Sequence, residues 1–393
     1  MKSNPTFRQQ SNVILAAFLI AAFIIGIAGA LQAPTLSRFL TDEVNVPPFL
    51  VGLFYSVNAI AGIIISFMLA QYSDRQGNRR HLILFCCLMG IGNSITFAFT
   101  RHYVVLITLG ISFSAIASAT MPQVFALARE YAVNIGRNIV TFNAILRAQI
   151  SLAWVIGPPL SFALAIHFGF TVMYLSAVGL FLIAVIIVLI FFPSISRQAL
   201  PEIKPVITEH SVTANHSVTL LFIATVFMWT ANMMYLIDMP LYVDKVLHLS
   251  SSLPGQLMGI AAGIEIPVML IAGLVVGRVG KKQLFCFAVM CGILFYIGVI
   301  LFTDTLILML LQLLNALFIG VVASIGIIYF QDLMPNRPGL ASTLFSNGVA
   351  TSVILAGLIQ GSVAGSLGHH VIYWIALAMI SISLLFCLLV RSV

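Results

Sequence analysis

Residues 70–82 read AQYSDRQGNRRHL, a short and basic stretch between two long apolar runs, 49–71 and 81–100. A helix of about 20 apolar residues crosses the hydrocarbon core of a bilayer, and inside that core every backbone polar group must find its partner within the helix. Both runs reach this length. The stretch therefore predicts a tight connection between two membrane-spanning helices.

The rest of the chain follows the same pattern. Of its 393 residues, 61% are hydrophobic and 7% are charged, and the mean hydropathy is +1.12. A soluble domain carries about 25% charged residues, so we expect lipid to cover most of this surface. The pattern predicts an all-α membrane protein with twelve spans, at 13–38, 49–71, 81–100, 103–127, 139–165, 170–192, 218–241, 254–276, 283–303, 305–330, 339–364 and 370–390.

The net charge of +7 comes from short basic clusters between the apolar runs, so it predicts orientation in a membrane and no nucleic-acid partner. If the N-terminus is cytoplasmic, fourteen Lys and Arg residues lie in loops on that side and three lie on the other. Cytoplasmic loops of membrane proteins carry the excess of Lys and Arg. We therefore expect both termini in the cytoplasm.

The two halves of the chain repeat each other. Three pairs of residues recur at separations of 203, 202 and 206 positions, namely Gly77 and Gly280, Glu130 and Asp332, and Pro34 and Pro240. We expect two pseudo-symmetric six-helix bundles, 1–192 and 218–393, joined by a polar cytoplasmic linker, 193–217. Repeats of this kind place the substrate site at their interface near the middle of the membrane.

The stretch 70–82 resembles the loop motif of the major facilitator superfamily, G-x-L-A/S-D-R-x-G-R-R/K-x-x-L, with departures at Ala70, Tyr72 and Asn78. Gly157-Pro158 is similar to the Gly-Pro of the antiporter motif, without the Gly-Gly that follows there.

A narrower resemblance covers nearly the whole chain. Residues 26–36, 125–132, 147–159 and 330–335 resemble segments of the enterobacterial sugar efflux transporter (SET) family. The resemblance implies proton-linked export of lactose, glucose and related glycosides across the bacterial inner membrane. The partners would be sugar, protons and lipid, and the chain would act as a monomer without a cofactor, driven by the proton gradient.

Three ionisable residues lie inside predicted spans, where such residues usually face the bundle interior. Arg147 and Glu265 lie near mid-span in opposite halves, and Asp238 lies nearer the periplasmic end. We expect Glu265 or Asp238 to carry the coupling proton, whose affinity would change as Arg147 moves. The alternatives are a permanent ion pair, a buried neutral Glu265 and a hydrated Asp238.

Sugars are neutral, so their site needs hydrogen-bonding groups and apolar or aromatic faces. Side-chain amides both donate and accept, which suits sugar hydroxyls; the alternative role is hydrogen bonding between helices. Asn93 and Gln360 are interpreted as packing residues, and His369 as a residue of a solvated loop. The predicted substrate-binding residues are Gln32, Asn58, Arg147, Gln149, Trp154, Asn232, Tyr235, Asp238, Gln312, Asn315 and Asn347.

The loop motif predicts a conformational lock formed by Asp74, Arg75, Gly77 and Glu130. Asp74 would lie against the N-terminus of the eleventh span, where free amides and the helix dipole stabilise a carboxylate. Arg75 would pair with Glu130. The alternative is a basic loop that only sets topology.

The sequence has no P-loop, no His-Glu-x-x-His and no Gly-x-Ser-x-Gly motif, and its five Cys and eight His residues lack metal-ligand spacing. We therefore expect a transporter without metal, and not an enzyme. A multidrug/proton antiporter and a non-transporting membrane sensor or receptor remain the alternative functions.

Overall fold

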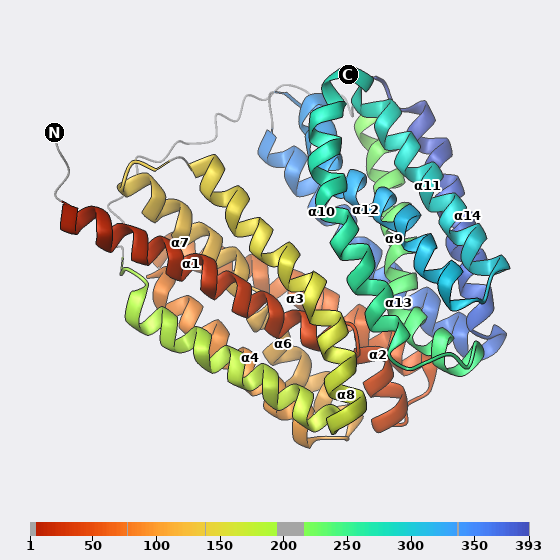
Figure 1. The fold of residues 1–393 in the computed structure, drawn as a ribbon, viewed down its shortest axis with the longest axis horizontal. Helices are drawn as coiled ribbons and strands as arrows, with labels where there is room; N and C mark the ends of the chain where they lie inside the picture. The colour runs from red at the N-terminus through yellow and green to blue at the C-terminus, as the bar shows by residue number, and fades with distance from the viewer. Residues whose placement is uncertain (1–4, 77, 138, 195–215, 336–337, 393) are drawn as a thin grey trace. The chain divides into compact units, whose positions relative to one another are not determined.

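The computed structural model describes residues 5–76, 78–137, 139–194, 216–335 and 338–392, and regular structure within these ranges is helical (Figure 1). Most of the predicted linker lies outside the described residues. The helices are α1 (Pro5–Gln32), α2 (Leu36–Arg38), η1 (Phe39–Glu43), α3 (Pro48–Gln76), α4 (Arg79–Phe99), α5 (Tyr103–Val105), η2 (Leu106–Gly110), α6 (Ile111–Ala117), α7 (Thr120–Asn134), α8 (Ile139–Phe191), α9 (His216–Leu241), η3 (Tyr242–Val246), α10 (Leu253–Val279), α11 (Lys281–Leu301), α12 (Thr305–Leu333), α13 (Pro338–Leu367) and α14 (His369–Leu389).

Eleven helical stretches of the described chain are long and apolar enough to cross a membrane. One of them, Ile145–Phe191, has 47 residues, about twice the length that a single crossing needs. Gly169 interrupts it with φ of 83°, a left-handed conformation that glycine adopts without strain. The fifth and sixth predicted spans therefore lie on either side of Gly169, and the prediction of a twelve-span all-α membrane protein is confirmed.

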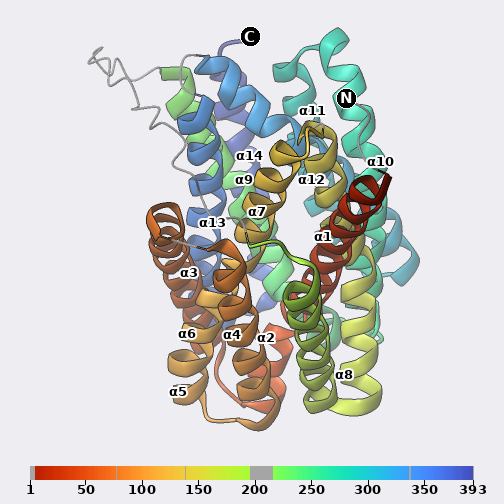
Figure 2. The ribbon, with the colours of Figure 1, turned by 90° about the vertical axis from the view of Figure 1, so that its left-hand side faces the viewer.

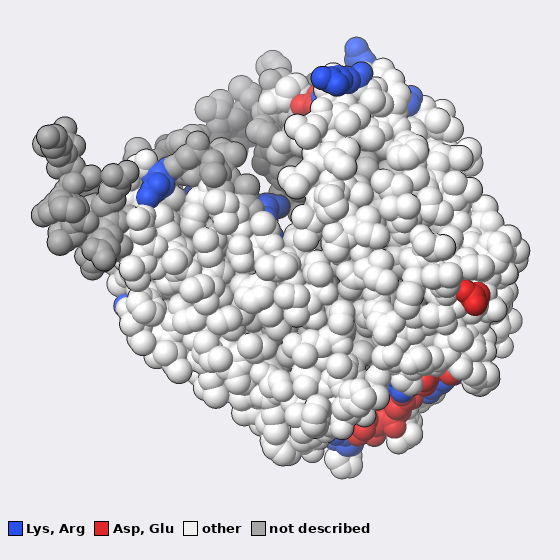
Figure 3. Space-filling model, in the orientation of Figure 1, with Lys and Arg blue, Asp and Glu red and all other residues white. Residues whose placement is uncertain are grey.

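The surface is that of a protein surrounded by lipid. Figure 3 shows a face that is almost free of charged side chains. Large apolar side chains point outward, among them Leu274 with 80% of its surface exposed and Phe67 with 63%. In water such exposure would promote association, whereas hydrocarbon solvates these side chains.

Contacts divide the chain into two compact units. Unit 1 comprises Met1–Ala33, Ile60–Gly157 and His167–Ser211, and unit 2 comprises Pro34–Ala59, Pro158–Ile166 and Val212–Val393. Unit 2 thus includes two segments from the first half of the sequence. The bundle boundaries 1–192 and 218–393 remain a prediction from the sequence.

Unit 1 is held together by aromatic packing and close helix contacts. Phe18 of α1 lies against Tyr131 of α7 and Phe192, with ring centroids 6.0 and 4.2 Å away. Helix α4 packs on α6 and α7, and Figure 2 shows α4 beside α6. A side chain at Gly90 of α4 would come within 2.7 Å of the Phe181 ring, so glycine allows this close approach.

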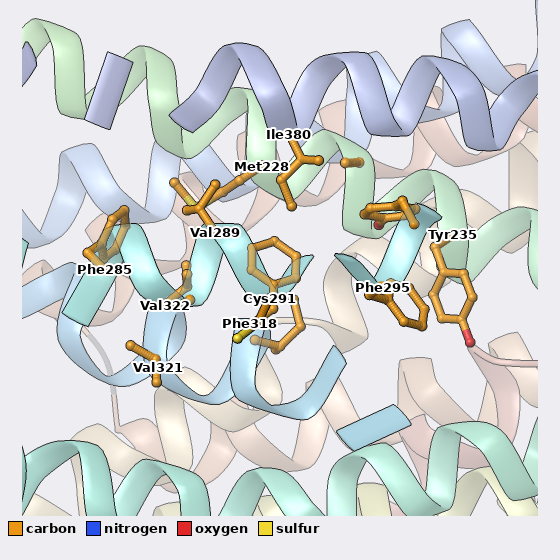
Figure 4. Close-up of a cluster of buried hydrophobic side chains, with 14 of the residues drawn as sticks. Met228, Tyr235, Phe285, Val289, Cys291, Phe295, Phe318, Val321, Val322 and Ile380 are labelled. Carbon is orange, nitrogen blue, oxygen red and sulfur yellow. The ribbon is translucent and has the colours of Figure 1, made fainter. Parts of the chain in front are cut away.

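Unit 2 has a core in which α9 packs on α13 and α14, and α12 packs on α10 and α11. Figure 4 shows part of this core, including Phe285, Val289, Phe318 and Ile380, all nearly or fully inaccessible. Gly292 of α11 lies close to Ile380, so a larger residue there would collide with it. Gly292 is 202 positions after Gly90, which allows the close approach of Phe181 in unit 1.

A second contact repeats between the units. Arg80 Nη2 donates to the carbonyl of Leu189 at 2.5 Å, and Lys282 Nζ donates to the carbonyl of Leu388 at 2.7 Å. In each case a basic side chain at the start of one helix binds a carbonyl in the last turns of another, where free carbonyls and the helix dipole favour a cation. These equivalent contacts support the internal repeat predicted from the sequence.

A seam of small residues joins α3 to α13 within unit 2. A side chain at Gly52 would collide with the Gly357 carbonyl and come within 2.6 Å of Gly361 Cα. The Ser56 hydroxyl donates to the Ile354 carbonyl at 3.0 Å along the same contact. Small residues one turn apart let membrane helices approach backbone to backbone. We call Gly52, Gly357 and Gly361 the glycine seam.

Candidate functional site

A polar cluster is buried between α9 and α12 of unit 2. Gln312 Nε2 donates to the Tyr235 hydroxyl at 3.2 Å and to the Leu308 carbonyl at 3.1 Å, while Asn315 Nδ2 donates to Gln312 Oε1 at 3.0 Å. The exposed fractions of Tyr235, Gln312 and Asn315 are 3%, 1% and 4%. Buried amides need partners, and here they supply them to each other. Three predicted substrate-binding residues are thus brought together.

A small cavity adjoins this cluster. Its lining includes Tyr235, Tyr242, Gln312 and Tyr373, and it has room for about one water molecule. The rings of Tyr242 and Tyr373 lie 4.5 Å apart, and Tyr235 meets Phe295 edge to face at 5.1 Å, as Figure 4 shows for the latter pair. The surface of the cavity is therefore almost entirely apolar and largely aromatic, while the Tyr235 hydroxyl and the Gln312 amide beside it bond to each other.

Asp238 lies one turn beyond Tyr235 on α9 and is completely buried. Its Oδ1 atom is 2.6 Å from Nδ1 of His369, the first residue of α14, and accepts a hydrogen bond of 3.2 Å from Gln360 Nε2 of α13. The His369 side chain is 16% exposed. Three helices thus converge on one carboxyl group.

Sequence reasoning does not connect His369 or Gln360 with Asp238. Both were interpreted differently, His369 as part of a solvated loop and Gln360 as packing. The one available signal was an isolated amide, Gln360, in an apolar run, followed nine positions later by a histidine directly after Gly368. Gly368 has φ of 82°, a left-handed turn into α14 that places His369 at the helix start.

Glu265 has a different environment. It lies in α10, is partly exposed, and makes no hydrogen bond or ion pair within the described part of the chain. Arg147 of α8 is exposed, with its guanidinium 5.9 Å from the centre of the Phe125 ring. The two residues belong to different compact units, so their relative movement remains a prediction.

The remaining predicted sugar-binding residues are dispersed. In unit 1, Gln32 Oε1 accepts from Asn93 Nδ2 at 3.0 Å, whereas Gln149 is partly exposed and Trp154 is 39% exposed. In unit 2, Asn232 is buried, Asn347 is exposed, and the buried Oδ1 of Asn58 has no hydrogen bond among the described residues.

A network of charges in unit 2 joins η1 to η3 and the turn that follows. Arg38 contacts Asp42 at 3.1 Å, Asp244 at 3.5 Å and the Ser251 hydroxyl at 3.1 Å. Lys245 contacts Asp42 at 2.8 Å. We call Arg38, Asp42, Asp244 and Lys245 the charged clasp. Sequence reasoning treated Arg38 and Lys245 only as loop charges.

Most of the predicted lock lies outside what the structure describes. The side chains of Asp74 and Arg75 are outside the described part, and so is the whole of Gly77. Glu130 pairs with Arg79, whose Nε lies 2.8 Å from Glu130 Oε1. In unit 2, Lys281 pairs with Asp332, and both residues follow their counterparts by 202 positions. The predicted pairing of Glu130 with Arg75 remains a prediction.

The chain matches known transporters over nearly its full length. The Major Facilitator Superfamily model matches residues 18–311. Sugar efflux transporter A of Escherichia coli (strain K12) is 52% identical over 381 residues, 97% of each chain. This chain belongs to the sugar efflux transporter family of the major facilitator superfamily. Sugar efflux transporter C of the same organism is 46% identical, covering 96% of each chain.

Solved structures agree on the fold. The nucleoside transporter NupG (D323A mutant) matches with a TM-score of 0.80 at 14% identity, covering 96% of this chain and 98% of its own. A bacterial homologue of the human lysosomal transporter Spinster matches with a TM-score of 0.78 at 11% identity, covering 96% of each chain. As a member of the sugar efflux transporter family, the chain is a multi-pass membrane transporter and not an enzyme.

Within the described residues, His, Cys, Asp and Glu side chains do not gather into a group of three that could hold a metal ion. The chemistry available at the site is hydrogen bonding, aromatic contact and proton binding. Hydrogen-bonding groups beside aromatic faces are the features by which a binding site orients a neutral polar solute.

Proposed function

We propose that this protein exports lactose, glucose and related glycosides from the cytoplasm across the bacterial inner membrane in exchange for protons. The observation that carries the proposal is the buried cluster of Tyr235, Gln312 and Asn315 beside an aromatic cavity. The relatives are named for sugar efflux, and they cover nearly the whole chain. The proton gradient supplies the energy, no cofactor is needed, and a monomer with both termini in the cytoplasm suffices.

The cluster has the chemistry for a sugar. The Gln312 and Asn315 amides donate and accept hydrogen bonds, and the tyrosine hydroxyls do the same. Aromatic rings offer flat apolar faces to the C–H side of a pyranose. A site for hydrophobic cations would need fewer buried amides, so these residues favour the sugar over the alternative multidrug substrate.

The sugar site must open before it can be filled. The cavity holds about one water molecule, whereas a monosaccharide is about ten times larger by heavy-atom count. Gln312 and Asn315 bond to each other and to Tyr235 while no sugar is present. A sugar that separates α9 from α12 would replace these bonds with bonds to its own hydroxyls.

Alternating access is the form of movement that fits these contacts. The charged clasp and the glycine seam both join a segment from the first half of the sequence to one from the second half. In an alternating-access cycle these contacts break and re-form as the binding site is exposed first to one side and then to the other. Exposed charge pairs contribute only about 0–1 kcal/mol each, which makes such a contact easy to reverse.

Purified protein in liposomes tests the proposal. Liposomes are loaded with radiolabelled lactose, glucose or a cationic dye, and release is measured with and without an imposed pH gradient. Release of a sugar that the gradient accelerates, with no effect on the dye, is the expected result. Gradient-driven release of the dye alone would show a multidrug antiporter, and no release of any solute would favour the sensor or receptor.

A further inference from the structure

Asp238 has no direct access to water. Its side chain is completely buried, and the atoms around it come from α9, α13 and α14 of a single compact unit. A carboxyl group in this position can gain or lose a proton only through a neighbour that itself reaches water. The neighbours with which it interacts are His369, Gln360 and Tyr373. Of these, an amide does not exchange protons near neutral pH, and a phenol is a poor acid there.

His369 is the neighbour that can pass a proton between water and Asp238. Its Nδ1 lies 2.6 Å from Asp238 Oδ1, and its side chain is 16% exposed. Imidazole has two nitrogens, so one can face a buried acceptor while the other exchanges with solvent, and its ordinary pKa is close to physiological pH. Nε2 has no partner among the residues that the structure describes. His369 therefore connects the buried carboxyl to the outside of the bundle.

We propose that His369 is the proton relay through which Asp238 is loaded and unloaded during sugar export. This inference rests on the proposed proton coupling and assigns it a route. In the loading step, water or hydronium gives a proton to Nε2, the Nδ1–H bond breaks, and an O–H bond forms at Asp238 Oδ1. One proton has then moved inward and the imidazole is neutral again. In the unloading step the transfers run in reverse: Asp238 Oδ1 returns its proton to Nδ1, Nε2 releases one to water, and the starting tautomer is restored.

The surroundings of the pair suit a relay and connect it to the sugar site. Gln360 donates to Asp238 Oδ1 and so stabilises the ionised carboxylate until the proton arrives. The other titratable groups nearby are Tyr373 and His370 of α14 and Tyr242 of η3, and the His370 ring is tilted against the Tyr242 ring, with centroids 6.3 Å apart. The two tyrosines also line the cavity beside Gln312. A change in the charge of Asp238 therefore changes the electrostatic environment of the two tyrosines that line the sugar cavity.

The adjacent histidine provides a matched control. His369→Gln retains a side-chain amide that can still donate to Asp238, but it cannot transfer a proton. His370→Gln makes the same substitution one position away, at a residue with no hydrogen bond to Asp238. Two measurements are made in liposomes: exchange of radiolabelled lactose at equal concentrations, which needs no gradient, and lactose movement driven by a pH gradient.

The relay predicts a split between the two measurements. His369→Gln should keep lactose exchange within about twofold of the unsubstituted protein and lose gradient-driven movement by about 100-fold, the scale of a lost proton-transfer group. His370→Gln should keep both. Gradient-driven movement that survives in His369→Gln would overturn the relay, and so would equal losses in both assays, because a purely structural histidine would affect them together.

Chemical rescue covers the case in which the glutamine variant does not fold. His369→Ala leaves a gap, and added imidazole should restore gradient-driven movement if proton transfer is the missing step; no restoration in a folded His369→Ala protein would contradict the relay. If the unsubstituted protein exchanges lactose but ignores the gradient, the proposed proton coupling is wrong and the relay falls with it. If the unsubstituted protein and His369→Gln both move lactose in response to the pH gradient, and do so equally well, the proton coupling stands and only the relay is wrong.

Discussion

Arg79 Nε lies 2.8 Å from Glu130 Oε1 and ties the start of α4 to α7. The same guanidinium also donates to Ser73 Oγ at 2.6 Å and to Gln123 Oε1 at 3.0 Å. Since Lys281 and Asp332 repeat the pair 202 positions later, the contact belongs to the duplicated unit. It is a hydrogen-bonded network, and its effect on stability should exceed that of an isolated surface ion pair.

Arg79→Ala should lower the thermal stability of the detergent-solubilised protein. The substitution removes the bonds of the guanidinium to Glu130, Ser73 and Gln123, and a hydrogen bond to a charged group is worth about 1.5–3 kcal/mol. Glu130→Gln should cost less, because an amide oxygen can still accept from Arg79. Arg129→Ala, at an exposed neighbour, is the matched control. Equal melting temperatures for Arg79→Ala and Arg129→Ala would contradict the network.

Gln312→Leu should impair sugar transport much more than it impairs folding. Leucine has nearly the same volume, but it removes the amide that bonds to Tyr235, Asn315 and Leu308. We expect transport to fall at least about tenfold, since one lost hydrogen bond to a sugar is worth about 1.5 kcal/mol. Gln331→Leu, near the end of the same helix, is the control; it bonds to Ser342 instead. Similar sugar transport in the two variants would rule out Gln312 as a sugar contact.

Arg38→Ala should change the transport rate more than Lys245→Ala. Arg38 contacts two carboxylates and Ser251, so its removal leaves Asp42 with Lys245 and leaves Asp244 without a cation in the described network. Lys245 contacts Asp42 alone within the described network. The difference should shrink in about 1 M salt, which screens exposed charges over about 3 Å. Rates measured at low and high salt check this, and an identical difference at both would exclude an electrostatic role for the charged clasp.

Substitution of the buried Asp238 and of the partly exposed Glu265 should affect proton coupling differently. Asp238→Asn should abolish gradient-driven sugar movement while leaving exchange measurable, because the side chain keeps its shape and loses its proton site. Glu265→Gln provides the comparison, since Glu265 bonds to no described residue. Proton uptake measured with a pH-sensitive dye during sugar export identifies the carrier. Coupling that persists in both variants would exclude both carboxyl groups.

Gly361→Ala should destabilise the protein, whereas Gly365→Ala should be tolerated. A Cβ at Gly361 would lie 3.0 Å from both Gly52 Cα and the Phe49 carbonyl oxygen, whereas one at Gly365 would lie 3.9 Å from Pro48. The first distance forces α3 and α13 apart, and the second is ordinary van der Waals contact. We expect a loss of about 1–3 kcal/mol for Gly361→Ala alone. Thermal melting of both variants is the measurement, and equal stability would contradict the close packing.

Local sequence features predicted the membrane spans and part of the site. Hydrophobic length is a property of a single segment, so the spans could be predicted without knowing their neighbours. The three-residue spacing of Asn232, Tyr235 and Asp238 likewise placed them on one helical stripe, and all three are buried. Gln312 and Asn315 were predicted from their amide side chains, which both donate and accept hydrogen bonds.

The partners of these residues could not be predicted in the same way. Gln360 and His369 are 122 and 131 positions from Asp238, and only the packing of α13 and α14 on α9 brings them there. Glu130 shows the same limit at shorter range. The sequence analysis paired Glu130 with Arg75 alone, and the contact of Glu130 with Arg79 depends on how the start of α4 packs beside α7.

The glycine seam has a practical consequence for capturing this transporter in one state. At the three glycines its surfaces are backbone, and the small Ser56 hydroxyl is the side chain that bonds across the contact. A methyl group added at Gly52 of α3 would act as a wedge that selects against this contact, at a position outside the sugar cluster and the Asp238–His369 pair. Gly52 is therefore the position at which a substitution would enrich the separated arrangement for inhibitor screening or structure determination.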